Sequence, residues 1–251
     1  MEVLFLDAPF NGIVELCKET LTHLKKKKYQ TVALYASVQF VNNLDKVKEQ
    51  LQQHNITIIT SHADRTQVKG QLLGCDNYRH SLNLSKEEEQ KIDCYLYIGD
   101  GKFHPLALVY AQKDQKELKE IICNDPLAAK MSLTAVFDIK TILKRYKSSL
   151  MKFLNSNTVG VLVTIKPGQE QFRPALALEK KFHDKRFYYF IDNAVSFDQL
   201  ENFNFIEVWI NAACPRIGFD DQEKFVKGVI NLNDAFMAEE MLSRESVMNS
   251  L

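Results

Sequence analysis

Short apolar runs alternate with amphipathic stretches along this chain of 251 residues. Runs with the composition of strands are expected at residues 3–6, 31–36, 56–60, 93–98, 120–123, 159–164, 186–191 and 207–210. Apolar residues at helical spacing predict helices at residues 12–27, 45–54, 103–111, 137–154, 169–182, 198–201 and 233–242. This repeated alternation predicts an α/β fold built from three-layer domains, with mainly parallel sheets and right-handed crossovers.

The alternation occurs twice, and the boundary between the two halves is expected near residues 127–136. Each half contains strand, helix, strand and loop, followed by a cysteine or a glycine-rich turn, which predicts a weak internal duplication. The first helix, at residues 12–27, is expected to use Asn11 as its N-cap.

One apolar run, from Val208 onward, ends in Ala-Ala-Cys-Pro-Arg. Because Pro215 cannot donate to a sheet ladder, the strand should end near Cys214. Binding crevices of open α/β sheets form at the carboxyl ends of strands, so Cys214 and Arg216 are candidates for a site. Three other stretches also begin where an apolar run stops and could line the same crevice, at residues 70–75, 97–105 and 166–169.

Bulk properties limit the class of protein. The formal net charge is zero, which argues against a nucleic-acid-binding surface as the main feature. No run approaches the 18 apolar residues of a transmembrane helix. Glu2 and Asp7 interrupt the first apolar patch, so a signal peptide is not expected. The expected location is the cytoplasm, without membrane association.

Five cysteines occur, and their odd number and wide spacing do not fit a secreted disulfide framework. Without a CxxC pair, neither a zinc ribbon nor the cluster loop common in radical enzymes can be recognised locally. A metal site would have to collect cysteines from distant segments. Cys94 and Cys123 fall within expected strands and are interpreted as core residues, and Cys17 as an apolar helix residue.

Several motifs occur together in a fixed order: Gly70-Gln-Leu-Leu-Gly-Cys75, Ile98-Gly-Asp-Gly-Lys-Phe-His-Pro105, Thr164-Ile-Lys-Pro-Gly-Gln169 and Trp209-Ile-Asn-Ala-Ala-Cys-Pro-Arg-Ile217. With Ser37-Val-Gln-Phe-Val41 and Phe219-Asp-Asp-Gln222, this series resembles the diphthamide-synthesis radical enzyme family, the 2-(3-amino-3-carboxypropyl)histidine synthases. The resemblance spans roughly residues 3–236 and looks closer to the archaeal form.

The resemblance implies a fold and a chemistry. Family members have three homologous α/β domains and hold a [4Fe-4S] cluster with one cysteine from each domain. They bind S-adenosylmethionine at the cluster and cleave its sulfur–γ-carbon bond. The 3-amino-3-carboxypropyl group goes to a histidine of elongation factor 2, the first step of diphthamide biosynthesis. An electron donor is also implied, while no catalytic acid or base is assigned.

Carried onto this chain, the resemblance makes residues 1–29 a remnant of the first domain, residues 30–132 the second-type domain and residues 133–251 the third-type domain. Cys75 and Cys214 then look like the second- and third-domain ligands. The first-domain ligand has no match, so three possibilities stay open. Another chain supplies the third thiolate, the cluster is held differently, or it is lost. The alternative functions are a non-catalytic partner subunit or a degenerate paralogue that binds S-adenosylmethionine or a cluster.

The same motifs contain candidate cofactor-binding residues: Gln39, Gly99, Asp100, Gly101, His104, Lys166, Gln169 and Arg216. The glycines permit close backbone approach to a ligand, and Asp100 could accept hydrogen bonds from ribose hydroxyls or an amine. Arg216 is preferred over Lys166 for the methionyl carboxylate because of its fork geometry. Each of these residues also fits a structural role as a turn, a cap or a loop brace, and Trp209 is interpreted as core.

The first helix is expected to lack its usual cover because its sheet neighbours would belong to the missing domain. Leu16, Leu21 and Leu24 are the candidates for an exposed apolar face. The sequence therefore predicts a homodimer, or a partner chain that supplies the third cysteine.

Overall fold

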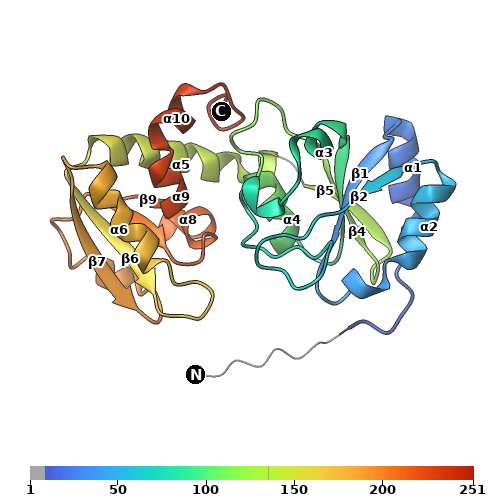
Figure 1. Ribbon diagram of the computed structural model, residues 1–251, viewed down its shortest axis with the longest axis horizontal. Helices are drawn as coiled ribbons and strands as arrows, with labels where there is room; N and C mark the ends of the chain where they lie inside the picture. The colour runs from blue at the N-terminus through green and yellow to red at the C-terminus, as the bar shows by residue number, and fades with distance from the viewer. Residues whose placement is uncertain (1–8, 135) are drawn as a thin grey trace. The chain divides into compact units, whose positions relative to one another are not determined.

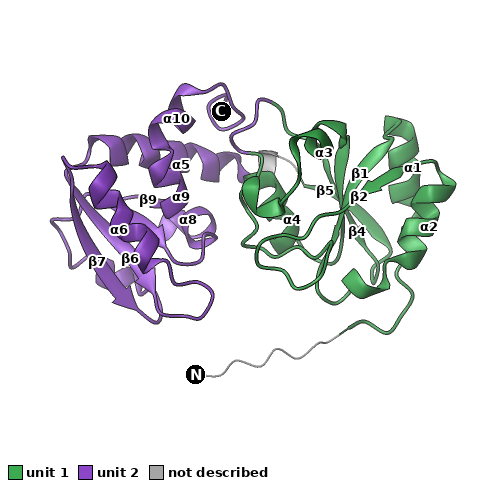
Figure 2. Ribbon diagram, viewed as in Figure 1, with its two compact units in different colours: residues 1–112, 117–138 green, residues 113–116, 139–251 purple. Residues whose placement is uncertain are grey.

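The computed structural model describes residues 9–134 and 136–251, and the strand expected at residues 3–6 lies outside them. The chain forms two compact units, shown in Figure 2. Unit 1 comprises residues 1–112 and 117–138, and unit 2 comprises residues 113–116 and 139–251. The chain therefore enters unit 2 for four residues, returns to unit 1, and enters unit 2 again. No described helix is both long enough and apolar enough to cross a membrane.

Unit 1 contains a five-stranded sheet in the order β2-β1-β3-β4-β5. Its strands are β1 (Thr31–Ala36), β2 (Thr57–Ile59), β3 (Cys94–Ile98), β4 (Ile121–Asp125) and β5 (Lys130–Thr134). Its helices are α1 (Lys18–Lys27), α2 (Asp45–Gln53), α3 (Lys86–Lys91) and α4 (Phe103–Tyr110), with short 3-10 turns η1 (Val41–Asn43) and η2 (His80–Leu82). β1 to β4 are parallel and β5 runs antiparallel to β4.

Unit 2 contains a four-stranded parallel sheet in the order β7-β6-β8-β9. Its strands are β6 (Thr158–Thr164), β7 (Arg186–Asp192), β8 (Val208–Ala212) and β9 (Val229–Asn231). Its helices are α5 (Val136–Asn155), which begins in unit 1, α6 (Phe172–Lys181), α7 (Phe197–Leu200), α8 (Ile217–Asp220), α9 (Leu232–Phe236) and α10 (Ala238–Ser243), with the 3-10 turn η3 (Gln222–Lys224). The α/β fold with mostly parallel sheets is thus confirmed (Figure 1).

The four parallel strands of each unit have the same order, because β2-β1-β3-β4 corresponds to β7-β6-β8-β9. A shared hydrogen-bond device supports the correspondence. Asp93, just before β3, accepts from the backbone N–H groups of Gln30 and Thr31 at 2.7 and 2.8 Å. Glu207, just before β8, accepts from those of Asn157 and Thr158 at 2.6 and 2.9 Å. These features agree with the predicted duplication.

The sheets are buried because their central strands are apolar on both faces. Every residue of β3 and β8 is buried, the pattern of a parallel strand covered on both sides. In unit 1, α1 and α2 pack on the face that carries Leu34 and Leu96. In unit 2, α6 and α9 contact the sheet, and Trp209 and Leu162 form a separate cluster with the α7 segment. Cys94 and Cys123 are core residues, as predicted, and so is Trp209.

The expected helix at residues 12–27 is wrong at its start, because α1 begins at Lys18 and its N-cap is Cys17, not Asn11. The preceding amides bond elsewhere. Leu16 N–H donates to Gln50 Oε1 at 2.7 Å, and Cys17 N–H donates to Asn124 Oδ1 at 2.9 Å. A backbone held by these two side chains cannot form the first helical turn, so Cys17 is a half-buried residue at the helix start.

The predicted exposed apolar face of this helix is also wrong. Leu16 is 3% exposed and Leu24 is fully buried, and Leu21 packs partly buried against the same core. The core is built on β1 and β3, so the N-terminal segment covers the sheet of unit 1. The described part of the segment interpreted as a remnant supplies a layer of this unit.

Other elements differ from the expectation. β5, β9, α3 and α8 were not expected, α6 starts at Phe172 instead of residue 169, and the last helix is divided into α9 and α10. The short length of β9 and the exposure of β5 explain why apolar runs do not mark them. By contrast, α3 carries a capping box between Ser85 and Glu88, a signal that the sequence contains.

Candidate functional site

The predicted site residues of unit 1 gather at the carboxyl ends of β1 and β3, the two strands between which the strand order changes sides. Strand order changes sense between β1 and β3, and ligands of open α/β sheets bind at the carboxyl ends of such strands. Ser37, just after β1, donates its N–H to Ile98 O at 3.1 Å, which joins the two strand ends. The Ser37 hydroxyl donates to Oε1 of the exposed Gln39 at 2.9 Å. Gln39 therefore lies at the predicted edge.

The loop that carries Cys75 is tied to the end of β1. Gln71 forms an isolated parallel bridge with Ala36. Ala36 N–H donates to Gly70 O at 2.8 Å, and Leu72 N–H donates to Ala36 O at 2.9 Å. These backbone bonds extend β1 with a piece of loop and leave Cys75, half-buried, three residues further on.

Two buried polar side chains follow Cys75. One carboxylate oxygen of Asp76 accepts from Leu73 N–H at 2.8 Å, while its Oδ1 has no hydrogen-bond partner in the described part of the chain. Both amide atoms of Asn77, which is fully buried, are likewise unpartnered within the described residues. Burial raises the pKa of the Asp76 carboxyl to about 6, against the lowering effect of the Leu73 N–H. Buried polar atoms without partners are uncommon and need an explanation, which makes the Cys75 loop unusual.

The Gly99-Asp100-Gly101 turn follows β3. A β-carbon at Gly99 would lie 2.6 Å from the Tyr97 hydroxyl, so this position requires glycine. Gly101 has a φ of 65°, in the left-handed region, and a β-carbon there would meet no atom within 4 Å. Asp100 is exposed. The turn thus leaves open space beside an accessible carboxylate.

His104 lies in the first turn of α4, where its ring stacks on Tyr97 with centroids 6.3 Å apart. The Tyr97 hydroxyl is buried without a hydrogen bond among the described residues. Burial raises the pKa of Tyr97, and the nearby Ser37 hydroxyl opposes this rise. A β-carbon at Gly74 would lie 2.2 Å from the Phe103 ring, which brings the Cys75 loop against the start of α4. The structure therefore brings together the unit 1 candidates.

In unit 2 the corresponding change in strand order lies between β6 and β8. Lys166 and Gln169 lie in the loop after β6, where Gln169 N–H donates to Lys166 O at 3.1 Å. Cys214 and Arg216 follow β8, the neighbouring parallel strand. The unit 2 candidates thus share the carboxyl edge of one sheet.

Two buried asparagines hold the Cys214 loop. Asn211 Nδ2 donates to Cys214 O at 2.9 Å and to Asn231 Oδ1 at 2.7 Å. Asn231 Nδ2 donates to Pro215 O at 2.9 Å. Both side chains are 2% exposed, so these bonds form away from water, where an unpaired group would be costly. Sequence reasoning missed both asparagines, although each follows an isoleucine at or next to the end of its strand.

A buried network continues behind this loop. Tyr146 Oη accepts from Asn231 N–H at 2.8 Å and donates to Asp234 Oδ2. Asp234 pairs with Lys113 at 3.4 Å, and both side chains are nearly fully buried. Lys113 belongs to the four residues by which the chain first enters unit 2. No sequence motif pointed to this ion pair, because its members lie far apart in the chain.

Arg216 differs from the expectation of an available guanidinium. It is 4% exposed, and its Nε and a terminal nitrogen contact Asp220 Oδ2 at 2.8 and 2.6 Å. Lys166 is exposed and makes no ion pair with any described residue. A carboxylate ligand would meet Lys166 without competition, whereas at Arg216 it would share the guanidinium with Asp220.

The cysteines can be tested for fit to a metal cluster by their chemistry and exposure. All five are thiols, and Cys75 and Cys214 are half-buried on loops, as metal ligands need to be. Within the described residues, no group of three or more His, Cys, Asp or Glu side chains gathers to hold a metal. The two thiols are of the chemical type that binds iron–sulfur clusters. Any further ligands would have to come from outside the groups that the described residues bring together.

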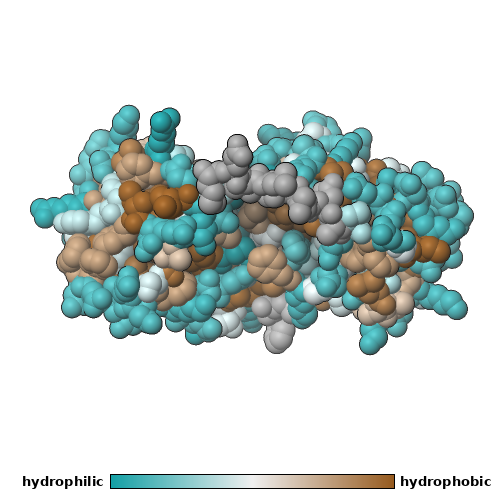
Figure 3. Space-filling model, turned by 90° about the horizontal axis from the view of Figure 1, so that it is seen from below, coloured by the Kyte–Doolittle hydropathy of each residue, from teal (hydrophilic) through white to brown (hydrophobic). Residues whose placement is uncertain are grey.

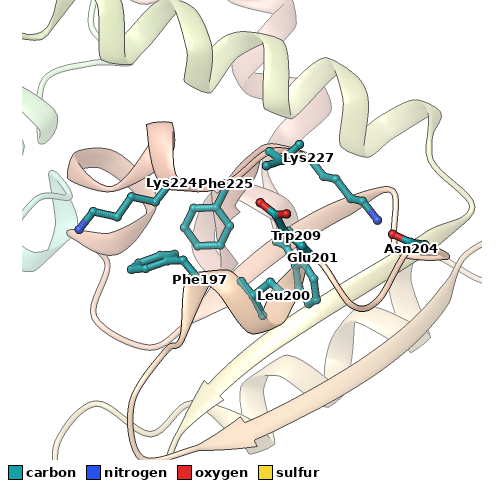
Figure 4. Close-up of a pocket in the computed structure, with 9 residues that line it drawn as sticks. Phe197, Leu200, Glu201, Asn204, Trp209, Lys224, Phe225 and Lys227 are labelled. Atoms are coloured by element: carbon teal, nitrogen blue, oxygen red, sulfur yellow. The ribbon is translucent and has the colours of Figure 1, made fainter.

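A hollow of about 140 Å³ in unit 2 contains none of the predicted site residues. Figure 4 shows Phe197, Leu200 and Trp209 beside Phe225, with Lys224 and Lys227 extending from its rim. Lys224 is paired with Asp221 at 2.7 Å, and Lys227 donates to Phe203 O at 2.9 Å. Phe197, Leu200, Trp209 and Phe225 of this lining belong to the core cluster around Trp209, and the other lining residues include Glu201, Asn204 and the two lysines.

Comparisons with known proteins identify the relatives of this chain. The family described as putative diphthamide synthesis protein matches residues 1–248. A 2-(3-amino-3-carboxypropyl)histidine synthase from Pyrococcus horikoshii is 29% identical over 222 residues, which cover 87% of this chain and 60% of that protein. Subunit 1 of the synthase from Yarrowia lipolytica is 23% identical over 229 residues, covering 89% of this chain and 49% of that protein.

The solved structures agree. Dph2 from Pyrococcus horikoshii superimposes with a TM-score of 0.70 at 26% identity, covering 90% of this chain and 61% of that chain. A second structure of Dph2, with a 4Fe-4S cluster, has a TM-score of 0.73 at 24% identity, covering 96% of this chain and 67% of that one, and supports the fold. The chain thus spans about three fifths of its archaeal relative. From the match over nearly its whole length, this chain belongs to the diphthamide synthesis family.

Proposed function

We propose that this chain takes part in the first step of diphthamide biosynthesis, the transfer of a 3-amino-3-carboxypropyl group from S-adenosylmethionine to a histidine of elongation factor 2. The observation that carries the proposal is the position of the two motif cysteines. Each lies on a loop near the topological switch point of its own sheet, where α/β proteins bind ligands. Family membership supplies the reaction class.

Cys75 and Cys214 would be the protein ligands of a [4Fe-4S] cluster, which supplies the electron for cleavage of S-adenosylmethionine. The backbone around each cysteine is fixed, by the bridge to β1 for Cys75 and by Asn211 and Asn231 for Cys214. Ligands held in place by hydrogen bonds to neighbouring groups bind metals more tightly. A third thiolate from another polypeptide segment, in this protein or a partner chain, would complete the set.

The remaining candidates would bind S-adenosylmethionine. Gly99 and Gly101 give the ligand access to the backbone, and Asp100, Gln39 and Gln169 offer exposed or half-exposed polar groups. Lys166 and Arg216 are the cations for the methionyl carboxylate, and the exposure of Lys166 makes it the more accessible of the two. His104, half-buried beside Tyr97, would contact the ligand from α4.

The test is anaerobic reconstitution with iron and sulfide, followed by iron counting and electron paramagnetic resonance. We expect Cys75→Ala and Cys214→Ala each to lose most of the bound iron. Cys17→Ser is the matched control, because Cys17 is also half-buried and its thiol contacts Thr20 Oγ1 at 3.3 Å. Equal iron content in all variants would refute the assignment of ligands.

A second experiment separates the enzyme from a partner subunit. The reconstituted chain is mixed with a reductant, elongation factor 2 and S-adenosylmethionine labelled in its carboxypropyl group. Transfer of label supports the complete activity in this chain. Bound iron without transfer favours the non-catalytic partner subunit. The observation that supports this alternative is that the described residues bring together no group of three or more metal-binding side chains. A chain that binds S-adenosylmethionine but no iron would be the degenerate paralogue.

A further inference from the structure

Two hollows of unit 2 adjoin each other, and neither is lined by a motif cysteine or a proposed cofactor residue. The first is the hollow of about 140 Å³ beside Trp209, which we call the apolar hollow. The second has a volume of about 450 Å³, and we call it the polar hollow. Phe225, Val226 and Lys227, in the turn before β9, line both of them. One small molecule could therefore occupy the two hollows together.

The polar hollow is lined by groups of the kind that bind phosphate. Four residues on one side of α5 contribute to it, at helical spacings of three and four: Arg145, Ser148, Ser149 and Lys152. Lys227 adds a third cation. Among the described residues that line this hollow, the one carboxylate is Glu223, whose Oε2 lies 3.7 Å from Arg145 Nη1. Arginine, lysine and serine hydroxyls are the usual side-chain donors to phosphate oxygens.

Two side chains in the wall of the polar hollow are buried and lack a partner. Ser149 is 7% exposed, yet its hydroxyl makes no hydrogen bond to any described residue. The Ser156 hydroxyl, by contrast, donates to Lys152 O at 2.7 Å, four residues back along the chain. Gln222 is also 7% exposed, and its Oε1 is unpartnered in the described chain. Buried polar groups without partners are costly, so both call for a partner from outside the chain.

The apolar hollow offers a place for a flat ring. Trp209 and Phe225 line it, and aromatic side chains hold flat ligands against their faces or edges. Its polar lining residues include Glu201 and Asn204, which are exposed. Figure 4 shows Lys227 extending toward Asn204. The carboxylate and the amide oxygen can accept hydrogen bonds from amino or hydroxyl groups of a ligand. This hollow therefore suits a ring that carries such groups.

Val226, on the turn that the hollows share, is 77% exposed. An exposed apolar residue has little meaning by itself. Hydrophobic residues reach the surface in other places as well, as Figure 3 shows for one face of the molecule. The informative feature is that Val226 lies between an apolar hollow and a cationic one. This arrangement fits a ligand with a ring at one end and an anionic group at the other.

We propose that unit 2 binds a nucleoside monophosphate across these two hollows. The base occupies the apolar hollow, the ribose hydroxyls lie within reach of Glu201, and the phosphate lies in the polar hollow beside Ser149 and Lys152. A nucleotide supplies all three chemical groups in one molecule. S-adenosylmethionine carries no phosphate and is not the ligand of this site. Failure of this proposal would leave the proposed function intact, and the reverse also holds.

The first test is titration of the protein with the four nucleoside 5′-monophosphates AMP, GMP, CMP and UMP. Trp209 is the one tryptophan of the sequence and lines the apolar hollow, so its fluorescence should change when a base enters. We expect at least one nucleotide to bind. The matching nucleoside and inorganic phosphate should each bind at least about tenfold more weakly, because each lacks one set of contacts. Calorimetry measures the dissociation constants.

The second test locates the phosphate. Ser149→Ala removes the buried hydroxyl and Lys152→Ala removes one charge. We expect each to weaken nucleotide binding about tenfold, the effect of losing one hydrogen bond to a charged group, and to leave nucleoside binding unchanged. Lys144→Ala is the matched control, because Lys144 is an exposed lysine of the same helix that does not line the polar hollow. Circular dichroism checks that all three variants fold.

Four results would overturn the proposal. Absence of binding by all four nucleotides excludes the site, and equal affinity for nucleotide and inorganic phosphate reduces it to a simple anion site. Unchanged affinity in both Ser149→Ala and Lys152→Ala, or an equal loss in Lys144→Ala, places the nucleotide elsewhere. Displacement of the bound nucleotide by S-adenosylmethionine assigns it to the proposed cofactor site. A nucleotide that S-adenosylmethionine does not displace, and that both variants weaken, supports the separate site.

Discussion

The side chains of Asn211 and Asn231 join the ends of β8 and β9 through a 2.7 Å hydrogen bond, and each asparagine also donates to a backbone carbonyl of the Cys214 loop. The pair is buried on the sheet face that carries Trp209. Gly218 is required beside it, because a β-carbon there would lie 2.1 Å from Asn231 Oδ1. The geometry of the candidate metal-binding loop therefore depends on two residues that would bind no metal themselves.

Removing one of the pair should loosen the loop. We expect Asn231→Ala to lower the free energy of unfolding by about 1–3 kcal/mol, because buried groups of Asn211 and Pro215 lose their partner. Alkylation of Cys214 should also become faster, as measured by mass spectrometry of the modified thiol. The exposed Asn204→Ala is the control. Unchanged alkylation in Asn231→Ala would show that the pair does not restrain Cys214.

Two glycines allow a comparison of packing. A β-carbon at Gly160 would lie 2.2 Å from the ring of the buried Trp209, which cannot move aside, so Gly160→Ala should cost about 1–3 kcal/mol. A β-carbon at Gly74 would come equally close to Phe103, but that ring is 52% exposed and can turn into solvent. We expect a cost below about 1 kcal/mol there. Urea denaturation of both variants measures the difference, and equal losses would contradict this reasoning.

Glu120 makes unit 1 sensitive to acid. Burial alone would raise its pKa, but the hydrogen bond and charge of His23, the charge of Lys27 and the hydroxyl of Tyr29 together lower it below 4.5. The folded state then binds the proton less tightly than the unfolded state. The stabilisation is present above the unfolded pKa and is lost as pH falls through the folded one.

We therefore expect the free energy of unfolding to fall more steeply below about pH 5 in the unsubstituted protein than in Glu120→Gln. At pH 7 this substitution should cost about 1.5–3 kcal/mol, the range for a hydrogen bond to a charged group. Urea titrations at a series of pH values measure both effects. Glu117→Gln, at an exposed neighbouring position, is the control. Parallel curves for the protein and Glu120→Gln would rule out this contribution.

Arg216 and Asp220 can be tested as competitors for a ligand. Under the proposed function, Arg216→Ala should weaken S-adenosylmethionine binding by about 1.5–3 kcal/mol, the range for a charged hydrogen bond. Asp220→Asn should tighten binding, because the carboxylate that now occupies the guanidinium loses its charge. Calorimetry measures both affinities. Equal affinity in all three proteins would remove Arg216 from the binding site and leave Lys166 as the candidate cation.

Strands with continuous apolar runs could be predicted from the sequence almost to the residue. β1 was expected at residues 31–36 and occurs there, and β3 and β8 differ at their ends by one or two residues. Such strands are buried on both faces, so nearly all of their residues are apolar and the run is visible in the sequence. β5 is exposed and polar and β9 has three residues, so tertiary pairing alone defines them.

The candidate site was predictable where a motif follows a strand. Gln39, the 99–101 turn, Lys166 and Cys214 all lie at the carboxyl edges of their sheets. The supporting residues were not predictable, because Asn231 and Lys113 act through contacts between distant segments. The start of α1 failed for a related reason. The side chains of Gln50 and Asn124 accept hydrogen bonds from backbone N–H groups that the expected helix would use. The periodicity of the local sequence gives no sign of these contacts with distant residues.

The brief entry of residues 113–116 into unit 2 has a consequence for how the halves can be separated. These residues supply Lys113 to the buried Asp234, and backbone carbonyls to Val247 and Met248 at 2.6 and 3.0 Å. A fragment that begins at residue 139 would lack residues 113–116. Its buried Asp234 carboxylate would then have lost the Lys113 ammonium group that pairs with it. Neither half is a module that recombination could transplant as one uninterrupted stretch of gene.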